Sequence, residues 1–112
     1  MTKYSIRVNN IAYNLLSKGI KKIEGRLYRS IFTKIKPNDI IFFHTRYING
    51  YISLIVKSIK KYNNFREMII EKGIKNVTPT CKNLDESLAI YRKFYKYRDE
   101  IKCGVIAIEF KT

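Results

Sequence analysis

The residues best suited to chemistry lie in the stretch GIKKIEGRLY, residues 19–28, which holds three cations and one carboxylate. Successive side chains of a strand point to opposite faces, so a fully extended segment would turn Lys21 toward the core together with Ile23. A buried ammonium without a partner is costly. We therefore expect Lys21 to lie just before the regular strand, at the rim of a sheet, where Glu24 can pair with Lys21, with Arg26 or with both.

Lys21 and Glu24 are the candidate catalytic residues. Burial disfavours the charged form of a lysine and lowers its pKa, and a lysine with a lowered pKa can take part in proton transfer. The alternative is a solvated strand in a protein that is basic throughout, with no site at all. The two interpretations differ in whether these side chains converge in a pocket.

Other catalytic systems lack the residues they need. His44 is the only histidine and follows an apolar run, so it is either a strand-end histidine with a satisfied ring nitrogen or a ligand-binding group. The glycines are scattered singly, which excludes a P-loop or a dinucleotide fingerprint. Cys81 and Cys103 are too far apart for a zinc site or a disulfide framework, and are expected to be small buried residues in a reducing compartment. We expect no metal and no cofactor.

Charge is the strongest global signal, because 23 Lys and Arg face 9 Asp and Glu, for a net charge of +14. Such a surface favours a polyanion, with nucleic acid ahead of a membrane. The composition bias of an AT-rich genome is the competing explanation for so many lysines. Tyrosines at expected strand ends could stack on bases or pack at the rim of the core. They are Tyr28, Tyr47 and Tyr51. The cations expected to meet phosphates are Lys22, Arg26, Arg29 and Arg46.

The first half of the chain reads as a strand, a helix and three further strands. Asn9 or Asn10 can cap a helix that ends at Gly19, with Ile11, Leu15 and Leu16 on one face. The expected strands cover residues 4–8, 22–28, 39–46 and 51–60. The apolar run DIIFFHTR predicts a strand buried on both faces, and Asn49-Gly50 predicts the hairpin turn that follows it.

Two helices and a closing strand are expected in the second half. One helix covers residues 65–72, between an Asn64 cap and a Gly73 stop. In the next, capped at Asn83, residues recur at helical spacing on one face, and we assign Phe94 to the core with them. Those residues are Leu84, Leu88, Tyr91 and Tyr95. The stretch CGVIAIEF alternates as a central strand does.

These elements predict one α+β domain over residues 1–112, with about five or six mostly antiparallel strands and about three flanking helices. A short chain can remove its sheet edges by curling into a small β-barrel. The sequence shows no signal peptide and no apolar run long enough to span a bilayer, so a cytoplasmic or otherwise intracellular protein is expected. A monomer is the expected oligomeric state.

The motif residues also carry a family resemblance. Gly19, Lys21, Glu24 and Arg26 fit the pattern G-x-K-x-x-E-x-R of the ASCH domain, a member of the PUA-like superfamily of small barrels. The likeness continues through KIKPNDIIFF and FREMIIEKG to the closing strand, and covers essentially the whole chain. It implies a PUA-like barrel whose cleft accepts RNA or a modified nucleoside.

Some members of the ASCH family, which this chain resembles, remove the acetyl group of N4-acetylcytidine with a Lys, a Thr and a Glu. Others are reported as ribonucleases. Lys21 matches the catalytic lysine, but Glu24 stands where those enzymes carry the threonine. A carboxylate would act as a base on water or form an anhydride. Glu67 and Glu71, on an expected helix, are physical candidates for a third group.

Three functions follow from these observations. The first is an RNA- or nucleoside-binding module whose basic cleft is lined by cations, a tyrosine and the lone histidine. The lining residues are Gly19, Lys22, Arg26, Tyr28, Arg29, His44 and Arg46. The second is a small amidohydrolase or ribonuclease that uses Lys21 and Glu24. The third is a protein-interaction domain that kept the fold and lost the pocket.

Overall fold

The computed structural model describes residues 1–112 as an α+β fold. The strands are β1 (Lys3–Arg7), β2 (Ile23–Leu27), β3 (Ile40–Thr45), β4 (Ile48–Tyr62) and β5 (Val105–Phe110). The helices are α1 (Asn10–Ser17), α2 (Phe65–Lys72), α3 (Ile74–Val77), α4 (Leu84–Phe94) and α5 (Tyr97–Cys103), and a 3-10 turn covers Ser30–Thr33. The α+β class is as predicted, with α3 and α5 in addition to the three expected helices. None of the helices is long and apolar enough to cross a bilayer.

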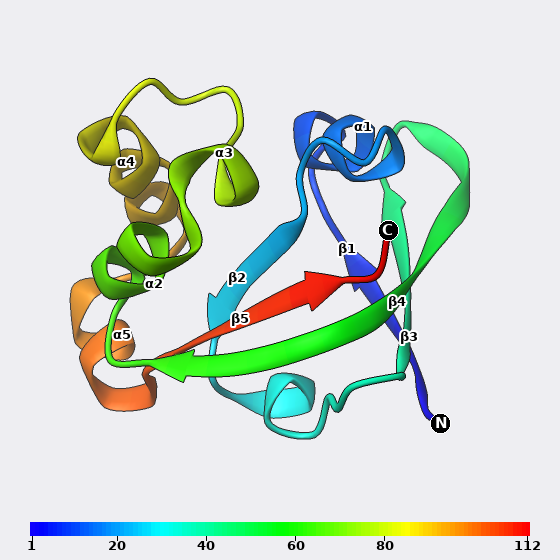
Figure 1. Cartoon of the computed structure of the whole chain (residues 1–112), viewed down its shortest axis with the longest axis horizontal. Helices are drawn as coiled ribbons and strands as arrows, with labels where there is room; N and C mark the ends of the chain where they lie inside the picture. The colour runs from blue at the N-terminus through cyan, green and yellow to red at the C-terminus, as the bar shows by residue number, and fades with distance from the viewer.

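The strands form one sheet in the order β1-β3-β4-β5-β2, in which only the β1–β3 pair is parallel (Figure 1). The long strand β4 pairs with β3 through its first half and with β5 through its second, and its register shifts between Val56 and Ser58. This irregularity lets the sheet bend. The sheet curls far enough for Arg26 of β2 to donate from Nη2 to the Arg7 carbonyl of β1 at 3.1 Å. A side chain thus bridges the seam of the small barrel.

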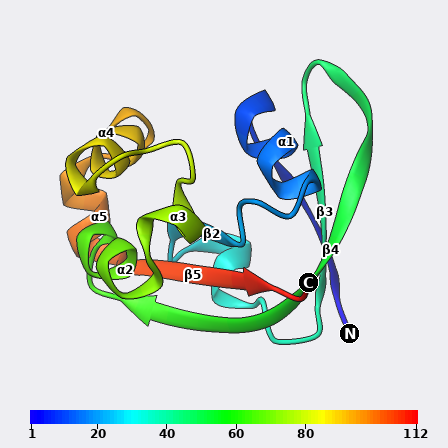
Figure 2. The same ribbon diagram turned by 45° about the horizontal axis from the view of Figure 1, so that its top comes forward.

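Strand β5 separates two hydrophobic cores, as its alternating sequence predicts. Ile106, Ile108 and Phe110 pack inside the curled sheet with Phe43. Val105 and Ala107 face the second core, which is roofed by α2 and α4. Helices α2 to α5 gather on one side of the molecule, while α1 lies apart from them, across a gap (Figure 2). The candidate site lies between α1 and the other helices.

Asparagine caps fix where three helices begin. The side chains of Asn9, Asn64 and Asn83 accept from the third backbone N–H along, at 2.8–2.9 Å. Gly19 and Gly73 follow α1 and α2 with φ of +72° and +93°, a region that glycine adopts without steric cost. The predicted starts and stops of these helices are confirmed.

The predicted hairpin turn is displaced by three residues. Thr45 pairs with Ile48, so Arg46 and Tyr47 form the turn, and Asn49-Gly50 lies inside β4. Three residues of β4, 49–51, lie opposite the single residue His44 of β3 at this point, and Gly50 has φ of +95°. The glycine therefore serves a bulge in the strand, which exploits the same positive φ as a tight turn.

Three burial predictions are also corrected. Strand β3 buries Ile41 and Phe43 completely but leaves its other face half-buried, because that face is covered partly by exposed side chains such as Tyr51. In α1, Leu16 of the predicted apolar face is buried, but Ile11 is 65% exposed and Tyr13 is the second buried residue of the helix. Both cysteines are half-buried free thiols.

Candidate functional site

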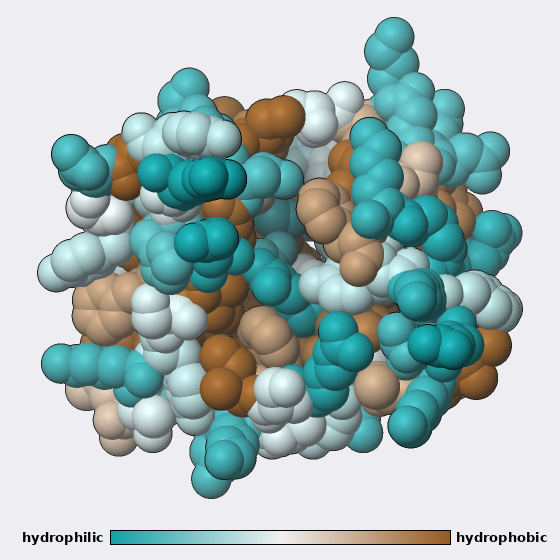
Figure 3. Space-filling model, turned by 180° about the vertical axis from the view of Figure 1, so that it is seen from behind, coloured by the Kyte–Doolittle hydropathy of each residue, from teal (hydrophilic) through white to brown (hydrophobic).

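A cleft of about 990 Å³ runs along the free edge of β2, between α1 on one side and the α3–α4 segment on the other. Strand β2 pairs only with β5, so its other edge is open. In the view from behind, the surface is hollowed between the two halves of the molecule, and hydrophilic and hydrophobic side chains both gather at the rim (Figure 3). The volume is typical of a small-molecule or cofactor site.

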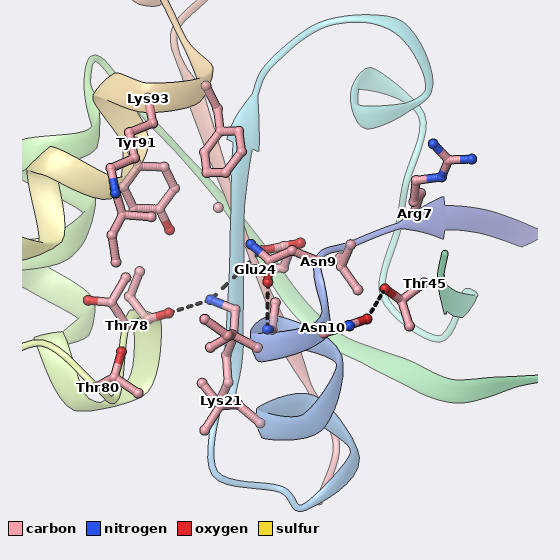
Figure 4. A pocket seen from close by; sticks show the side chains of 18 of the residues that line it. Arg7, Asn9, Asn10, Lys21, Glu24, Thr45, Thr78, Thr80, Tyr91 and Lys93 are labelled. Atoms are coloured by element: carbon pink, nitrogen blue, oxygen red, sulfur yellow. Dashed lines mark hydrogen bonds and ion pairs between the residues drawn. The ribbon is translucent and has the colours of Figure 1, made fainter. Parts of the chain in front are cut away.

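The floor of the cleft is an ion-paired group made by Lys21, Glu24 and Arg26. The Lys21 and Glu24 side chains are only 7% and 8% exposed, and Lys21 Nζ lies 3.8 Å from Glu24 Oε1. Arg26 donates from Nε at 3.3 Å and from Nη2 at 3.1 Å to Glu24 Oε2. Lys21 Nζ also donates to the Val77 carbonyl (Figure 4). Glu24 therefore pairs with both cations.

Local geometry explains how these residues come together. After Gly19 turns the chain out of α1, the Lys21 N–H donates to the Leu15 carbonyl, so Lys21 is held before the regular strand. Glu24 and Arg26 are two apart in β2 and share one face of the pleat. The side chains enter the cleft from the strand and its approach.

Burial governs the protonation of Lys21. Desolvation lowers the pKa of its amine below the ordinary value of 10.5, against the opposing attraction of Glu24. A lysine in this state can release its proton more easily than a surface lysine, and as a neutral amine it can accept one. The floor can therefore donate hydrogen bonds, accept them at Glu24, or exchange a proton.

Polar groups from other elements complete the walls. Thr45 of β3 donates to Asn10 Oδ1 of α1 at 2.7 Å, and Thr78, after α3, donates to Ser87 of α4 at 2.7 Å. Asn10, Thr45 and Thr78 all line the cleft. Sequence reasoning missed all three, because isolated Asn and Thr residues carry no spacing signal.

The rim carries positive charge and aromatic rings. Arg7, Arg46 and Lys93 join Lys21 and Arg26, so five cations and one carboxylate line the cleft. Tyr47 and Phe94, 76% and 62% exposed, stand on its opposite sides. The assignment of Phe94 to the core is wrong, because its side chain at the end of α4 is exposed.

The structure brings together some of the predicted site residues and leaves others outside. Lys21, Glu24, Arg26 and Arg46 line the cleft, as does Tyr47. The following residues lie outside it: Gly19, Lys22, Tyr28, Arg29, His44 and Tyr51.

Those outside residues have other surroundings. The Tyr28 ring packs against the core and beneath Lys61, whose Nζ lies 3.9 Å from its centroid. His44 accepts the Val8 N–H at its backbone carbonyl within the sheet.

The two glutamates considered for a third catalytic group also lie elsewhere. Glu67 accepts the Asn63 N–H, and Glu71 pairs with Lys60. Both line a second, smaller groove at the base of α2 and α5. They are therefore in no position to act with Lys21.

Comparison with known proteins points to one family. Residues 8–112 match the ASCH domain. The crystal structure of hypothetical protein PH0355 is 40% identical, with a TM-score of 0.91 over 98% of each chain. The solution structure of protein PF0455 from Pyrococcus furiosus is 38% identical, with a TM-score of 0.81 over 98% of this chain and 96% of that one. No curated protein matches.

Proposed function

The chain belongs to the ASCH domain family, and from this premise we propose that it binds single-stranded RNA or a modified nucleoside in the cleft along β2. One observation carries the proposal: buried Lys21 and Glu24 and half-buried Arg26 converge as an ion-paired group on the floor of a concave site. Buried charges are costly to fold, so a set that only served solubility would remain on the surface. Convergence also argues against a protein-interaction surface, on which these side chains would be splayed and exposed.

The lining matches the chemistry of a nucleotide. The rim cations Arg7, Arg46 and Lys93 can neutralise phosphates, and the excess of positive charge favours an anionic ligand. The exposed rings of Tyr47 and Phe94 can stack on bases. The floor offers both donors and an acceptor to the polar edge of a base.

Charge reversal at the rim tests this function. Binding of a fluorescent single-stranded RNA is measured by anisotropy at low salt for the wild type, Arg46→Glu and Arg66→Glu. Arg46 lines the cleft, whereas Arg66 is an exposed cation on α2 outside it, so the two variants change net charge equally. We expect Arg46→Glu to weaken binding about tenfold or more and Arg66→Glu to weaken it far less. Equal losses, or no binding by the wild type, contradict the proposal.

A second candidate is hydrolysis of a modified nucleoside or of RNA. It is favoured by the lowered pKa of Lys21 and by the carboxylate 3.8 Å from its amine. Lys21 as a neutral amine, or Glu24 as a carboxylate, could take a proton from an attacking water, and the Arg26 guanidinium could stabilise the negative charge that develops. The chemistry known for the threonine-bearing relatives does not transfer whole, because Glu24 has no hydroxyl nucleophile.

A further inference from the structure

Tyr91 is a buried tyrosine whose hydroxyl has no hydrogen-bond partner within the protein. The residue is 6% exposed and lines the cleft, and the close view shows it on the α4 wall facing Glu24 and Lys21 (Figure 4). The hydroxyl oxygen is not sealed from solvent, so it can be reached from the cleft. An unpaired hydroxyl in a cleft is therefore available to a ligand.

Packing on both sides fixes the Tyr91 ring and therefore the position of its hydroxyl. Tyr91 stacks on Phe65 of α2, with ring centroids 4.2 Å apart and an interplanar angle of 16°. On the strand side, a Cβ added at Gly25 would lie 2.9 Å from the Tyr91 hydroxyl. Glycine at this position thus lets the hydroxyl sit against the β2 backbone. A group fixed before binding loses little freedom when it meets a ligand.

The backbone of Gly25 adds polar groups beside that hydroxyl. The hydrogen bonds to β5 that flank β2 fall on even-numbered residues: the Lys22 carbonyl accepts from Phe110, and the Tyr28 N–H donates to Gly104. The paired register continues this alternation through β2, so Glu24 and Arg26 bond to β5 in the same way. Residues between hydrogen-bonded pairs direct their N–H and C=O the other way. The amide and carbonyl of Gly25 therefore face the open edge of β2, inside the cleft.

The Tyr91 hydroxyl is a donor under all ordinary conditions. Desolvation, followed by the negative charge of Glu24, raises the pKa of Tyr91 well above 10. The hydroxyl thus keeps its proton and can donate a hydrogen bond to a ligand. The complementary ligand atom is an acceptor, such as a carbonyl oxygen or an unprotonated ring nitrogen.

We propose that Tyr91 is a specificity-determining residue: its hydroxyl donates a hydrogen bond to a carbonyl oxygen or ring nitrogen of a nucleobase that lies along the open edge of β2. The base meets Gly25 on the strand and Tyr91 on the helix, while the phosphate faces the cationic rim. This assignment rests on the proposed function and names the residue that discriminates between bases. A site built to hydrogen-bond a ligand rejects one that leaves the bond unmade.

The test removes one hydroxyl and compares the four bases. Affinities for AMP, GMP, CMP and UMP are measured by calorimetry for the wild type, Tyr91→Phe and Tyr62→Phe. Tyr62 is the control, because it is also a buried tyrosine but lies outside the cleft. Thermal unfolding of each variant verifies that the fold is intact.

We expect Tyr91→Phe to weaken the preferred nucleotide roughly 3- to 10-fold and the least preferred one less than about 2-fold, so that selectivity shrinks. Tyr62→Phe should leave all four affinities unchanged. A uniform loss over the four nucleotides, or no loss, overturns the role of Tyr91 while leaving the proposed function standing. A wild type that binds neither these nucleotides nor RNA overturns both.

Discussion

At the residue scale, the site depends on a buried lysine–glutamate pair, Lys21 and Glu24, and on the half-buried Arg26 that shares the same carboxylate. Removing one partner of a buried ion pair leaves the other uncompensated, at a cost of about 3–5 kcal/mol. Glu24 is the shared partner, since it faces Lys21 at 3.8 Å and Arg26 at 3.1 Å. Its replacement would leave the buried Lys21 ammonium next to the half-buried Arg26 guanidinium with no carboxylate between them, so Glu24 is structurally necessary whichever reaction or ligand the cleft serves.

The hydrolytic candidate makes a prediction about Lys21 and pH. The lowered pKa means that the fraction of neutral amine grows as pH rises through a value below 10.5. If this amine is the base, turnover of N4-acetylcytidine rises with pH over the same range and then levels off. Lys21→Ala should lose about 100-fold or more, the usual contribution of a general base.

The neighbouring Lys22 supplies the control for this assay. It is exposed and outside the cleft, so Lys22→Ala should retain wild-type turnover. Equal turnover in the wild type and Lys21→Ala would remove Lys21 from the mechanism. Absence of turnover of both N4-acetylcytidine and RNA in the wild type would remove the hydrolytic candidate and leave RNA binding as the function.

The pairing of site residues could be predicted from the sequence only where the residues are close together in the chain. Glu24 and Arg26 share a strand face, so their pairing follows from pleat geometry. Thr45 and Thr78 reach the cleft from separate elements, and no local pattern joins them to Lys21. Tyr91 satisfied the helical period of a core residue, and it is buried as expected; only the three-dimensional structure shows that its hydroxyl is left free.

At the scale of elements, helix starts were the most predictable features. The Asn64 and Asn83 caps accept from the N–H groups of Glu67 and Glu86. We expect Asn64→Ala and Asn83→Ala each to lower the free energy of unfolding by about 1 kcal/mol, because one N–H of the first turn loses its partner. Thermal or urea unfolding measures the change.

Asn63 is the control for the cap variants, since its exposed side chain caps no helix. Asn63→Ala should stay within about 0.5 kcal/mol of the wild type. Destabilisation of the same size in all three variants would show that the caps contribute nothing beyond an ordinary surface asparagine.

The elements that sequence reasoning missed are held by tertiary contacts. Helix α5 begins at Tyr97, the preceding Lys96 provides no side-chain cap, and Glu100 anchors the helix from a fully buried position. Glu100 Oε2 accepts the Phe65 N–H of α2, and Oε1 pairs with Arg92 of α4. Such a helix is defined by its partners and not by its own sequence. The hairpin was likewise misplaced because Gly50 has the positive φ of a turn but uses it in a bulge.

At the scale of the whole molecule, fold class follows from element order, whereas the position of the cleft does not. The order of elements predicted the curled α+β sheet. Strand β5 lies inside this sheet, between β4 and β2, as expected for a strand that is not at an edge. The cleft arises because β2 is left as an open edge between α1 and α4, a consequence of topology that appears only in three dimensions. The net charge of +14 does not locate the cleft either, since the lysines and arginines are spread along the whole chain.

The claim that RNA binds in the cleft, and not over the basic surface at large, is tested most directly by NMR. The ¹⁵N-labelled protein is titrated with a single-stranded RNA hexanucleotide, and amide shifts are mapped onto the structure. The account predicts changes concentrated in residues 21–26 and in the wall residues Thr78 and Thr80, with the groove formed by residues 60–64 unaffected. Shifts spread evenly over the exposed lysines, or centred on that second groove, would contradict it.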